Sequence, residues 1–156
     1  MIQRIQSIYM LMAVIIAAIT FFVPLASFTA EGLQGFYELS GYSFKGMGIE
    51  NFNGTPKNPW GVLISMSTYI VLISVAIFKF KKRMTQLKLI RWSYFVLFVY
   101  YFAVASYCYA FASNSETMFN FSILSLLPIV ALTLTHLAAR AIRKDEALVR
   151  AADRIR

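Results

Sequence analysis

The sequence has little of the chemistry that enzymes and metal centres use. It contains one cysteine, Cys108, and one histidine, His136, among 156 residues. A single cysteine excludes an intramolecular disulfide and any paired-cysteine redox or metal motif. The chain also has no glycine-rich phosphate-binding motif. We therefore predict a protein that is not an enzyme and that holds no metal ion or other cofactor.

Acidic residues are scarce, and none lies within the long apolar runs of the chain. The seven are Glu31, Glu38, Glu50, Glu116, Asp145, Glu146 and Asp153. Carriers driven by protons or sodium usually need a carboxylate inside the bilayer, where a charge is costly to bury and is kept for function. The sequence thus argues against an ion-coupled carrier.

Hydrophobic residues make up 59% of the chain and charged residues only 14%. The apolar runs are about 20 residues long, which is the length of a membrane-spanning helix. We predict an all-α membrane protein with a single domain, a four-transmembrane-helix up-and-down bundle. The predicted spans are residues 5–25, 59–78, 91–111 and 119–139, and Pro128 in the last is expected to bend its helix.

The first apolar run, residues 8–23, permits two interpretations. A cleaved signal peptide would have a shorter apolar region and a small-residue cleavage motif after it. No clear motif of that kind follows this run. We favour a first helix that is retained as a membrane span.

Basic residues outnumber acidic ones, and their distribution predicts the orientation. Of the fifteen, Arg4, six residues in 79–91 and six in 140–156 make thirteen on one side, against Lys45 and Lys57 on the other. Loops rich in lysine and arginine stay on the cytoplasmic side of the membrane. We predict a multi-pass membrane protein with both termini and the loop 79–90 in the cytoplasm. The cations are expected to meet membrane lipids, and we expect no nucleic-acid partner.

The outer loop, residues 28–58, predicts a small extracytoplasmic β-hairpin between the first two helices. Residues 25–29 and 34–44 are rich in aromatic side chains, as strands are, and Ala30–Leu33 reads as the turn. The hairpin should pack on the outer helix ends, because its aromatic residues would otherwise face water. These aromatic residues are Phe36, Tyr37, Tyr42 and Phe44.

Aromatic residues of the third span form a stripe at helical spacing, Tyr94, Phe98 and Tyr101, which Ala105 and Cys108 continue. A planar ligand such as a quinone would fit such a face. A packing face is the simpler interpretation, and we favour it. Small-residue ridges, Ala13 and Ala17 on the first helix and Ala131, Thr135 and Ala139 on the fourth, predict close helix approach within the monomer or between subunits.

His136 lies one turn before Arg140, near the cytoplasmic end of the fourth span. It would serve as a haem ligand or a quinone hydrogen-bond donor, or it would bond a neighbouring group inside the bundle. We favour the second role. Cys108 is interpreted as a small packing residue.

The tail, residues 140–156, contains no glycine or proline and is rich in helix formers. We predict that it continues the fourth helix or lies along the membrane surface. Its distal residues carry both charge signs, which suits docking on a protein surface, although a solvated helix would use the same pattern. The candidate docking residues are Arg150, Asp153, Arg154 and Arg156.

The start of the chain, Met1–Tyr9, its four-span spacing with one long outer loop and its ending, Lys144–Arg156, together resemble a known family. It is an uncharacterised family, a domain of unknown function, of small four-span inner-membrane proteins from the Bacteroidetes. The resemblance covers essentially the whole chain and implies a bacterial inner membrane. It implies no activity and transfers no functional residue.

These observations favour a non-catalytic role. We predict a scaffold or accessory subunit of an inner-membrane complex, with another membrane protein as its partner. The alternative is a lipid- or quinone-binding four-helix membrane protein.

Overall fold

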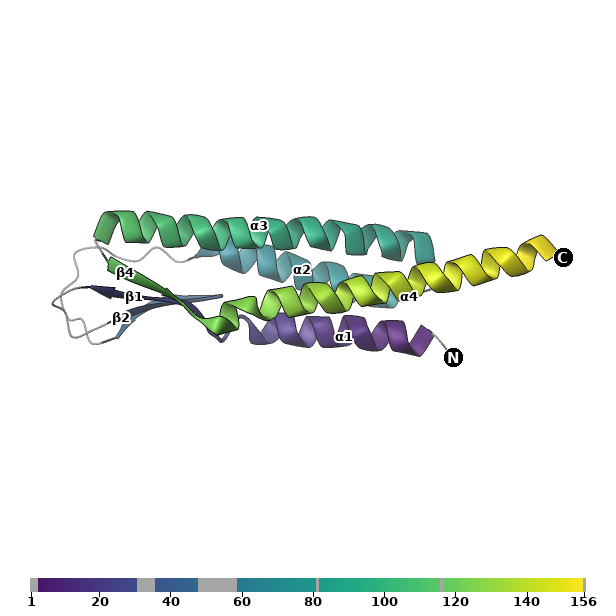
Figure 1. Cartoon of the computed structure of the whole chain (residues 1–156), viewed down its shortest axis with the longest axis horizontal. Helices are drawn as coiled ribbons and strands as arrows, with labels where there is room; N and C mark the ends of the chain where they lie inside the picture. The colour runs from purple at the N-terminus through teal and green to yellow at the C-terminus, as the bar shows by residue number, and fades with distance from the viewer. Residues whose placement is uncertain (1–2, 31–35, 48–58, 81, 116, 156) are drawn as a thin grey trace.

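The computed structural model describes residues 3–30, 36–47, 59–80, 82–115 and 117–155. Four helices run alternately up and down along one long axis (Figure 1). A small sheet lies at one end of the bundle, and both termini lie at the other end. The helices are α1 (Gln3–Ile19), α2 (Trp60–Phe78), α3 (Arg83–Ser115) and α4 (Leu127–Ile155).

Among the described residues, three helical segments are long and apolar enough to cross a membrane: Trp60–Phe78, Arg83–Ala110 and Ile123–Val149. The apolar part of α1, Ile5–Ile19, is shorter. The predicted first span, 5–25, was therefore too long, because α1 ends at Ile19 and a strand begins at Pro24. Proline lacks the N–H group that continues a helix, so it favours this change of structure.

The helices pack as two pairs, α1 with α4 and α2 with α3, and the pairs then meet face to face. The small-residue ridges predicted on α1 and α4 are buried, which fits the close packing of these two helices within the monomer. Large side chains fill the rest of the core. The largest in the helices are Met10, Met66, Tyr69, Ile73, Ile90, Leu97, Tyr100 and Ile142.

The sheet has four antiparallel strands in the order β3-β2-β1-β4. They are β1 (Pro24–Ala30), β2 (Phe36–Ser40), β3 (Phe44–Met47) and β4 (Thr117–Phe121). The predicted hairpin is confirmed in the pairing of β1 with β2, while most of its turn lies outside the described residues. The second predicted strand, 34–44, was too long, because the chain turns after Ser40, where the Ser40 amide donates to the Ser43 carbonyl at 2.8 Å.

Strand β4 was not predicted. It comes from the connection between α3 and α4 and pairs with β1, with Phe28 opposite Phe119 and Ala26 opposite Phe121. The predicted fourth span, 119–139, was therefore placed too early. A short 3₁₀ helix, η1 (Ile123–Leu126), precedes α4, so Pro128 lies in the first turn of α4 rather than at its middle. At that position the missing N–H of proline removes no helical hydrogen bond, and no bend is required.

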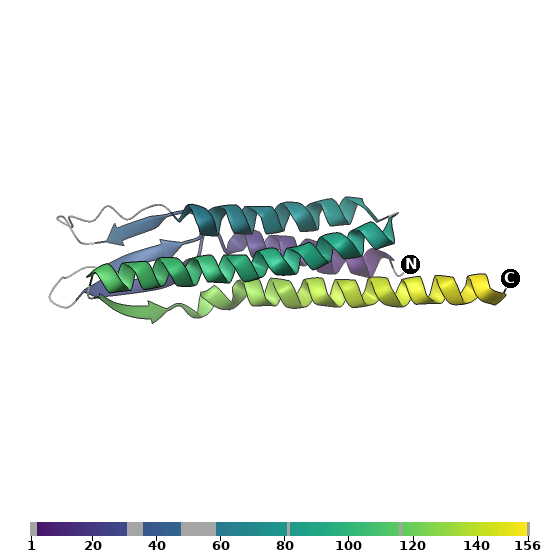
Figure 2. The ribbon, with the colours of Figure 1, turned by 90° about the horizontal axis from the view of Figure 1, so that it is seen from above.

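At the opposite end, α3 begins at Arg83, so most of the predicted loop 79–90 is helical. The predicted tail, residues 140–156, continues α4 as one helix to Ile155. This is the first of the two arrangements expected from the sequence, a continuation of the fourth helix. Figure 2 shows α4 extending past the other helices at this end, and α3 extending past the sheet-side ends of α1 and α2 at the other.

Of the four aromatic residues expected to anchor the hairpin, the structure describes the side chain of Tyr42 alone. Its ring centroid lies 6.1 Å from that of Phe22, in the turn that follows α1. Leu25, Phe28 and Leu39 form the buried part of the sheet.

Candidate functional site

A buried polar contact joins the first and last helices near the chain termini. The side-chain amide of Gln6 on α1 donates a hydrogen bond to the carboxylate of Asp145 on α4. Both side chains are buried, at 6% and 8% exposure. A carboxylate needs a donor when it leaves water, and the Gln6 amide supplies one. Asp145 is thus part of the helix packing and not a solvated residue of the tail.

A second buried amide lies in the same layer of the bundle. Gln86 on α3 is 2% exposed, and its Nε2 atom lies 3.8 Å from the sulfur of Met10 on α1. Met10 follows Gln6 by one helical turn. Polar side chains from α1, α3 and α4 therefore lie within the bundle close to its terminal end.

Beside this layer, the start of α3 is tied to α4. Nη1 of Arg83 lies 3.7 Å from Oε2 of Glu146, and each side chain is 25% exposed. An open groove runs between the two segments, and its lining includes Phe80, Lys82 and Met84. Other exposed cations lie on the first half of α3 and near or beyond the middle of α4: Lys88, Arg91, Arg140, Arg143 and Lys144. This end of the molecule is therefore strongly basic.

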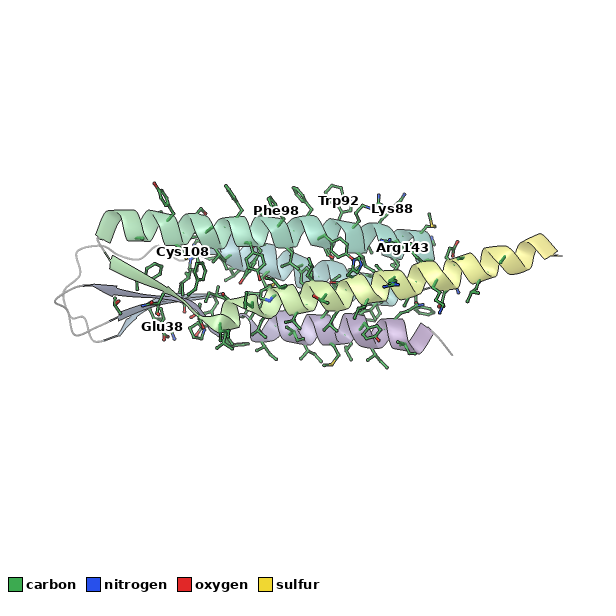
Figure 3. All side chains as sticks on the ribbon, viewed as in Figure 1. Glu38, Lys88, Trp92, Phe98, Cys108 and Arg143 are labelled. Carbon is green, nitrogen blue, oxygen red and sulfur yellow. The ribbon has the colours of Figure 1, made fainter. Side chains whose placement is uncertain are left out.

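The predicted apolar ligand face, Tyr94, Phe98 and Tyr101, does not form one uniform surface. Phe98 is 72% exposed and projects away from the bundle (Figure 3). Tyr94 and Tyr101 are half-buried, and the Tyr101 hydroxyl donates to the Ser125 carbonyl at 3.1 Å. Tyr101 thus fixes η1 to α3, which is a packing role.

The ring of Tyr94 lies beside that of His136, with 6.4 Å between the centroids. Contrary to the favoured expectation, His136 is exposed rather than placed inside the bundle. Cys108 is buried with 4% exposure, as a packing residue would be.

The candidate docking residues of the tail belong to the last turns of α4. Arg150, Asp153 and Arg154 lie on the helix backbone, but their side chains are outside the described residues, as is Arg156 altogether. Their docking role therefore stays a prediction.

A surface of exposed aromatic residues runs along the outer side of α3, and we call it the α3 aromatic face. Its members are 59–78% exposed: Trp92, Phe95, Phe98, Phe102 and Tyr109. Trp92 and Phe98 point away from the other helices (Figure 3). The exposed large side chains of α1 are instead mainly aliphatic, with Ile5, Ile8, Leu11 and Ile15. Those along the middle of α2 are aliphatic as well, Ile64, Val71 and Val75, while its two ends carry Trp60 and Phe78.

A family model described as "Domain of unknown function (DUF4293)" matches residues 2–155, which is nearly the whole chain. The chain belongs to this family. The match confirms the resemblance to an uncharacterised family, and the DUF4293 description assigns no activity to any residue. A comparison with curated proteins gives no match.

Sequence reasoning on this DUF4293 chain missed the contact between Gln6 and Asp145. A signal for it was present in the spacing of α4. The buried residues Ala131, Thr135, Ala138 and Ile142 recur every three or four positions, and the next step in that series is Asp145. The inward face of α4 therefore extends beyond the apolar part of the sequence.

Proposed function

We propose that the chain is a four-span protein of the bacterial inner membrane that acts as a non-catalytic accessory subunit. Both termini and the connection between α2 and α3 would lie in the cytoplasm, and the sheet outside it. The arrangement of charges supports this orientation. The termini, the α2–α3 connection and the cations near them share one end of the molecule (Figure 1). Such cationic ends remain on the cytoplasmic side.

The outward side of α1 supports its inclusion as the fourth span. Ile5, Ile8, Leu11, Ile15 and Ile19 are 44–56% exposed. Seventeen residues of helix cover about 26 Å. This length falls only a few Å short of a hydrocarbon core of about 30 Å, and the bilayer adjusts to such a mismatch at modest cost.

Four buried hydroxyl groups that bond within the bundle support a structural rather than a catalytic use. The hydroxyl groups of Ser65, Ser93 and Thr135 donate to carbonyls of their own helices. The hydroxyl of Tyr69 on α2 lies 3.3 Å from that of Thr135 on α4. Groups that bond one another stabilise the bundle and are not available for a substrate.

The observation that carries the proposed function is the α3 aromatic face. The membrane interface itself favours Trp92 and Tyr109, which lie toward the two ends of the span. Phe95, Phe98 and Phe102 lie between them. Lipid chains solvate aliphatic and aromatic side chains alike, so contact with lipid alone gives no reason for this part of α3 to differ from α1 and the middle of α2. Aromatic residues are enriched where proteins bind one another, because they bury large rigid surfaces. We propose that this face binds an apolar transmembrane helix of another membrane protein.

A pull-down of the tagged full-length protein in mild detergent tests this function. Phe98→Ala with Phe102→Ala should abolish recovery of a stoichiometric membrane-protein partner. The matched control is Ile8→Ala with Ile15→Ala on the exposed face of α1, which should retain the partner. If both double variants retain it, the α3 aromatic face is not the docking surface.

One observation favours the lipid- or quinone-binding alternative. The Tyr94 hydroxyl is buried and, within the described residues, has no hydrogen-bond partner, while the ring of His136 lies next to the Tyr94 ring. A quinone carbonyl would accept a hydrogen bond from that hydroxyl. Solvent extraction of the purified protein should then yield a quinone, and Tyr94→Phe should remove it.

A further inference from the structure

An open groove of about 720 Å³ lies where the start of α3 meets the distal half of α4. Apolar side chains, Phe80, Met84 and Val149, form part of its wall. Lys82, Arg83 and Glu146 supply its charges. A second hollow of about 260 Å³ shares Met84 and Glu146 with the groove and is lined in addition by Leu87, Arg143 and Ala147. Together they form one channel along the seam between α3 and α4, which we call the α3–α4 groove.

The α3–α4 groove carries a surplus of positive charge. Glu146 forms an ion pair with Arg83. Within the part of the chain that the structure describes, Lys82 and Arg143 have no ion-pair partner. Three cations and one carboxylate thus line the groove, and a ligand with a single negative charge would meet an attractive field.

The groove also has an exposed apolar wall beside its charges. Phe80 and Met84 are 49% and 55% exposed, so they leave apolar surface open beside the cations. Phe80 and Lys82 lie two and four positions after Trp60–Phe78, a helix that is long and apolar enough to cross a membrane. In the proposed orientation, this position lies at the level where phospholipid headgroups meet acyl chains.

We infer that the α3–α4 groove binds one anionic phospholipid of the cytoplasmic leaflet. The phosphodiester lies between Arg143 and Lys82, and an acyl chain lies against Met84 and Leu87. Basic pockets between membrane helices on the cytoplasmic side are suited to such headgroups. The inference rests on the proposed membrane orientation.

An acidic segment of a protein partner fits the groove less well. Glu146 lies inside the groove and would repel each further carboxylate of such a segment. A phosphodiester carries one charge, which the surplus cations neutralise. The exposed apolar wall also matches an acyl chain.

Native mass spectrometry of the full-length protein in mild detergent, titrated with phosphatidylglycerol and with phosphatidylethanolamine, tests the inference. Phosphatidylglycerol should bind more tightly, and Arg143→Gln should weaken its binding about fivefold, as expected when one direct contact between a cation and the anionic headgroup is lost. The matched control is Lys88→Gln, which removes a cation from the outer side of α3 (Figure 3) and should change the affinity less than twofold. Glu146→Gln should tighten binding, a gain that a misfolded protein would not show.

Three outcomes would overturn the inference. Equal losses in Arg143→Gln and Lys88→Gln would mean that only general surface charge attracts the lipid. Displacement of the lipid by soluble glycerol phosphate at the same concentration would assign the site to a free phosphate group. Loss of a stoichiometric protein in Arg143→Gln, with unchanged lipid affinity, would assign the groove to a protein partner. None of these results depends on the α3 aromatic face, so the lipid site and the docking function fail independently.

Discussion

The Nε2 atom of Gln6 on α1 donates a hydrogen bond to Oδ2 of Asp145 on α4, across 139 positions of sequence. This hydrogen bond connects the first helix of the bundle to the last, at the end where both termini lie. Removal of the carboxylate leaves a buried amide without its acceptor.

We predict that Asp145→Ala lowers the free energy of unfolding by about 1–3 kcal/mol. Lys144→Ala, one position earlier on an exposed site, should change it by no more than about 0.5 kcal/mol. Unfolding midpoints in detergent measure both. A double-mutant cycle with Gln6→Ala isolates the pair, and additive effects of the two substitutions would show that the hydrogen bond contributes nothing.

The proposed orientation predicts which positions a membrane-impermeant thiol reagent reaches from outside the cell. In a Cys108→Ala background, Lys45→Cys on the sheet should be labelled, and Thr85→Cys on the first turns of α3 should be labelled only after the membrane is permeabilised. Both positions are exposed in the folded protein, so a difference in labelling would report the side of the membrane on which each lies. Labelling of residue 85 in intact cells would reverse the orientation.

The pairing of β1 with β4 predicts a specific crosslink. Ser27 lies opposite Asn120 in the register of these strands. With Cys108 replaced by alanine, Ser27→Cys and Asn120→Cys should form a disulfide readily under mild oxidation. Ser27→Cys with Ser122→Cys, shifted by two positions, should react more slowly. Equal rates would contradict the register.

Gly41 and Gly61 differ in the space available for a Cβ atom, so alanine should change the stability of the protein differently at the two positions. A Cβ atom at Gly41 would lie 2.9 Å from the Cα atom of Phe21 and 3.0 Å from the Thr20 carbonyl oxygen. These backbone atoms cannot move aside easily, so Gly41→Ala should cost about 1–3 kcal/mol of folding free energy. At Gly61 the nearest atom is a side-chain carbon of Tyr107 at 3.4 Å, so Gly61→Ala should be neutral or slightly stabilising. Thermal unfolding in detergent would rank the two variants.

Tyr42 provides a prediction about pH. A hydrogen bond from Lys45, whose Nζ atom is 3.3 Å from the phenol oxygen, lowers the pKa of Tyr42, and the charge of Lys45 adds to the effect. The bond favours the phenolate, so its stabilising contribution is present at high pH and is lost as the pH falls through the lowered pKa. Lys45→Ala should raise the pKa toward 10.0, the ordinary value. An NMR titration of ring-labelled tyrosine, assigned with Tyr42→Phe, measures it.

The sequence was sufficient to predict the helical architecture, the antiparallel order and the β1–β2 hairpin, because long apolar runs and aromatic strands give strong local signals. It was insufficient for β4. Thr117–Phe121 has strand-forming residues, but it adjoins an apolar run and reads as the start of a helix. Its pairing with β1 is a long-range contact that local periodicity does not report.

The α3–α4 groove and the buried Asp145 were missed for a related reason. An aspartate in a charged tail is normally solvated, and its burial depends on a donor from the other end of the chain. Nothing in a single sequence indicates that Gln6 and Asp145 lie in contact. Only the three- and four-residue spacing on α4 pointed to the inward position.

The central position of β1 has a consequence for the order of assembly. During synthesis, β1 and β2 leave the ribosome long before β4, so β1 keeps one edge unpaired until residue 121 has been made. An unpaired strand edge invites pairing with other chains. The sheet therefore becomes complete only after α3 has been made. In the proposed orientation, the pairing of β4 with β1 would couple completion of the sheet outside the membrane to insertion of α3.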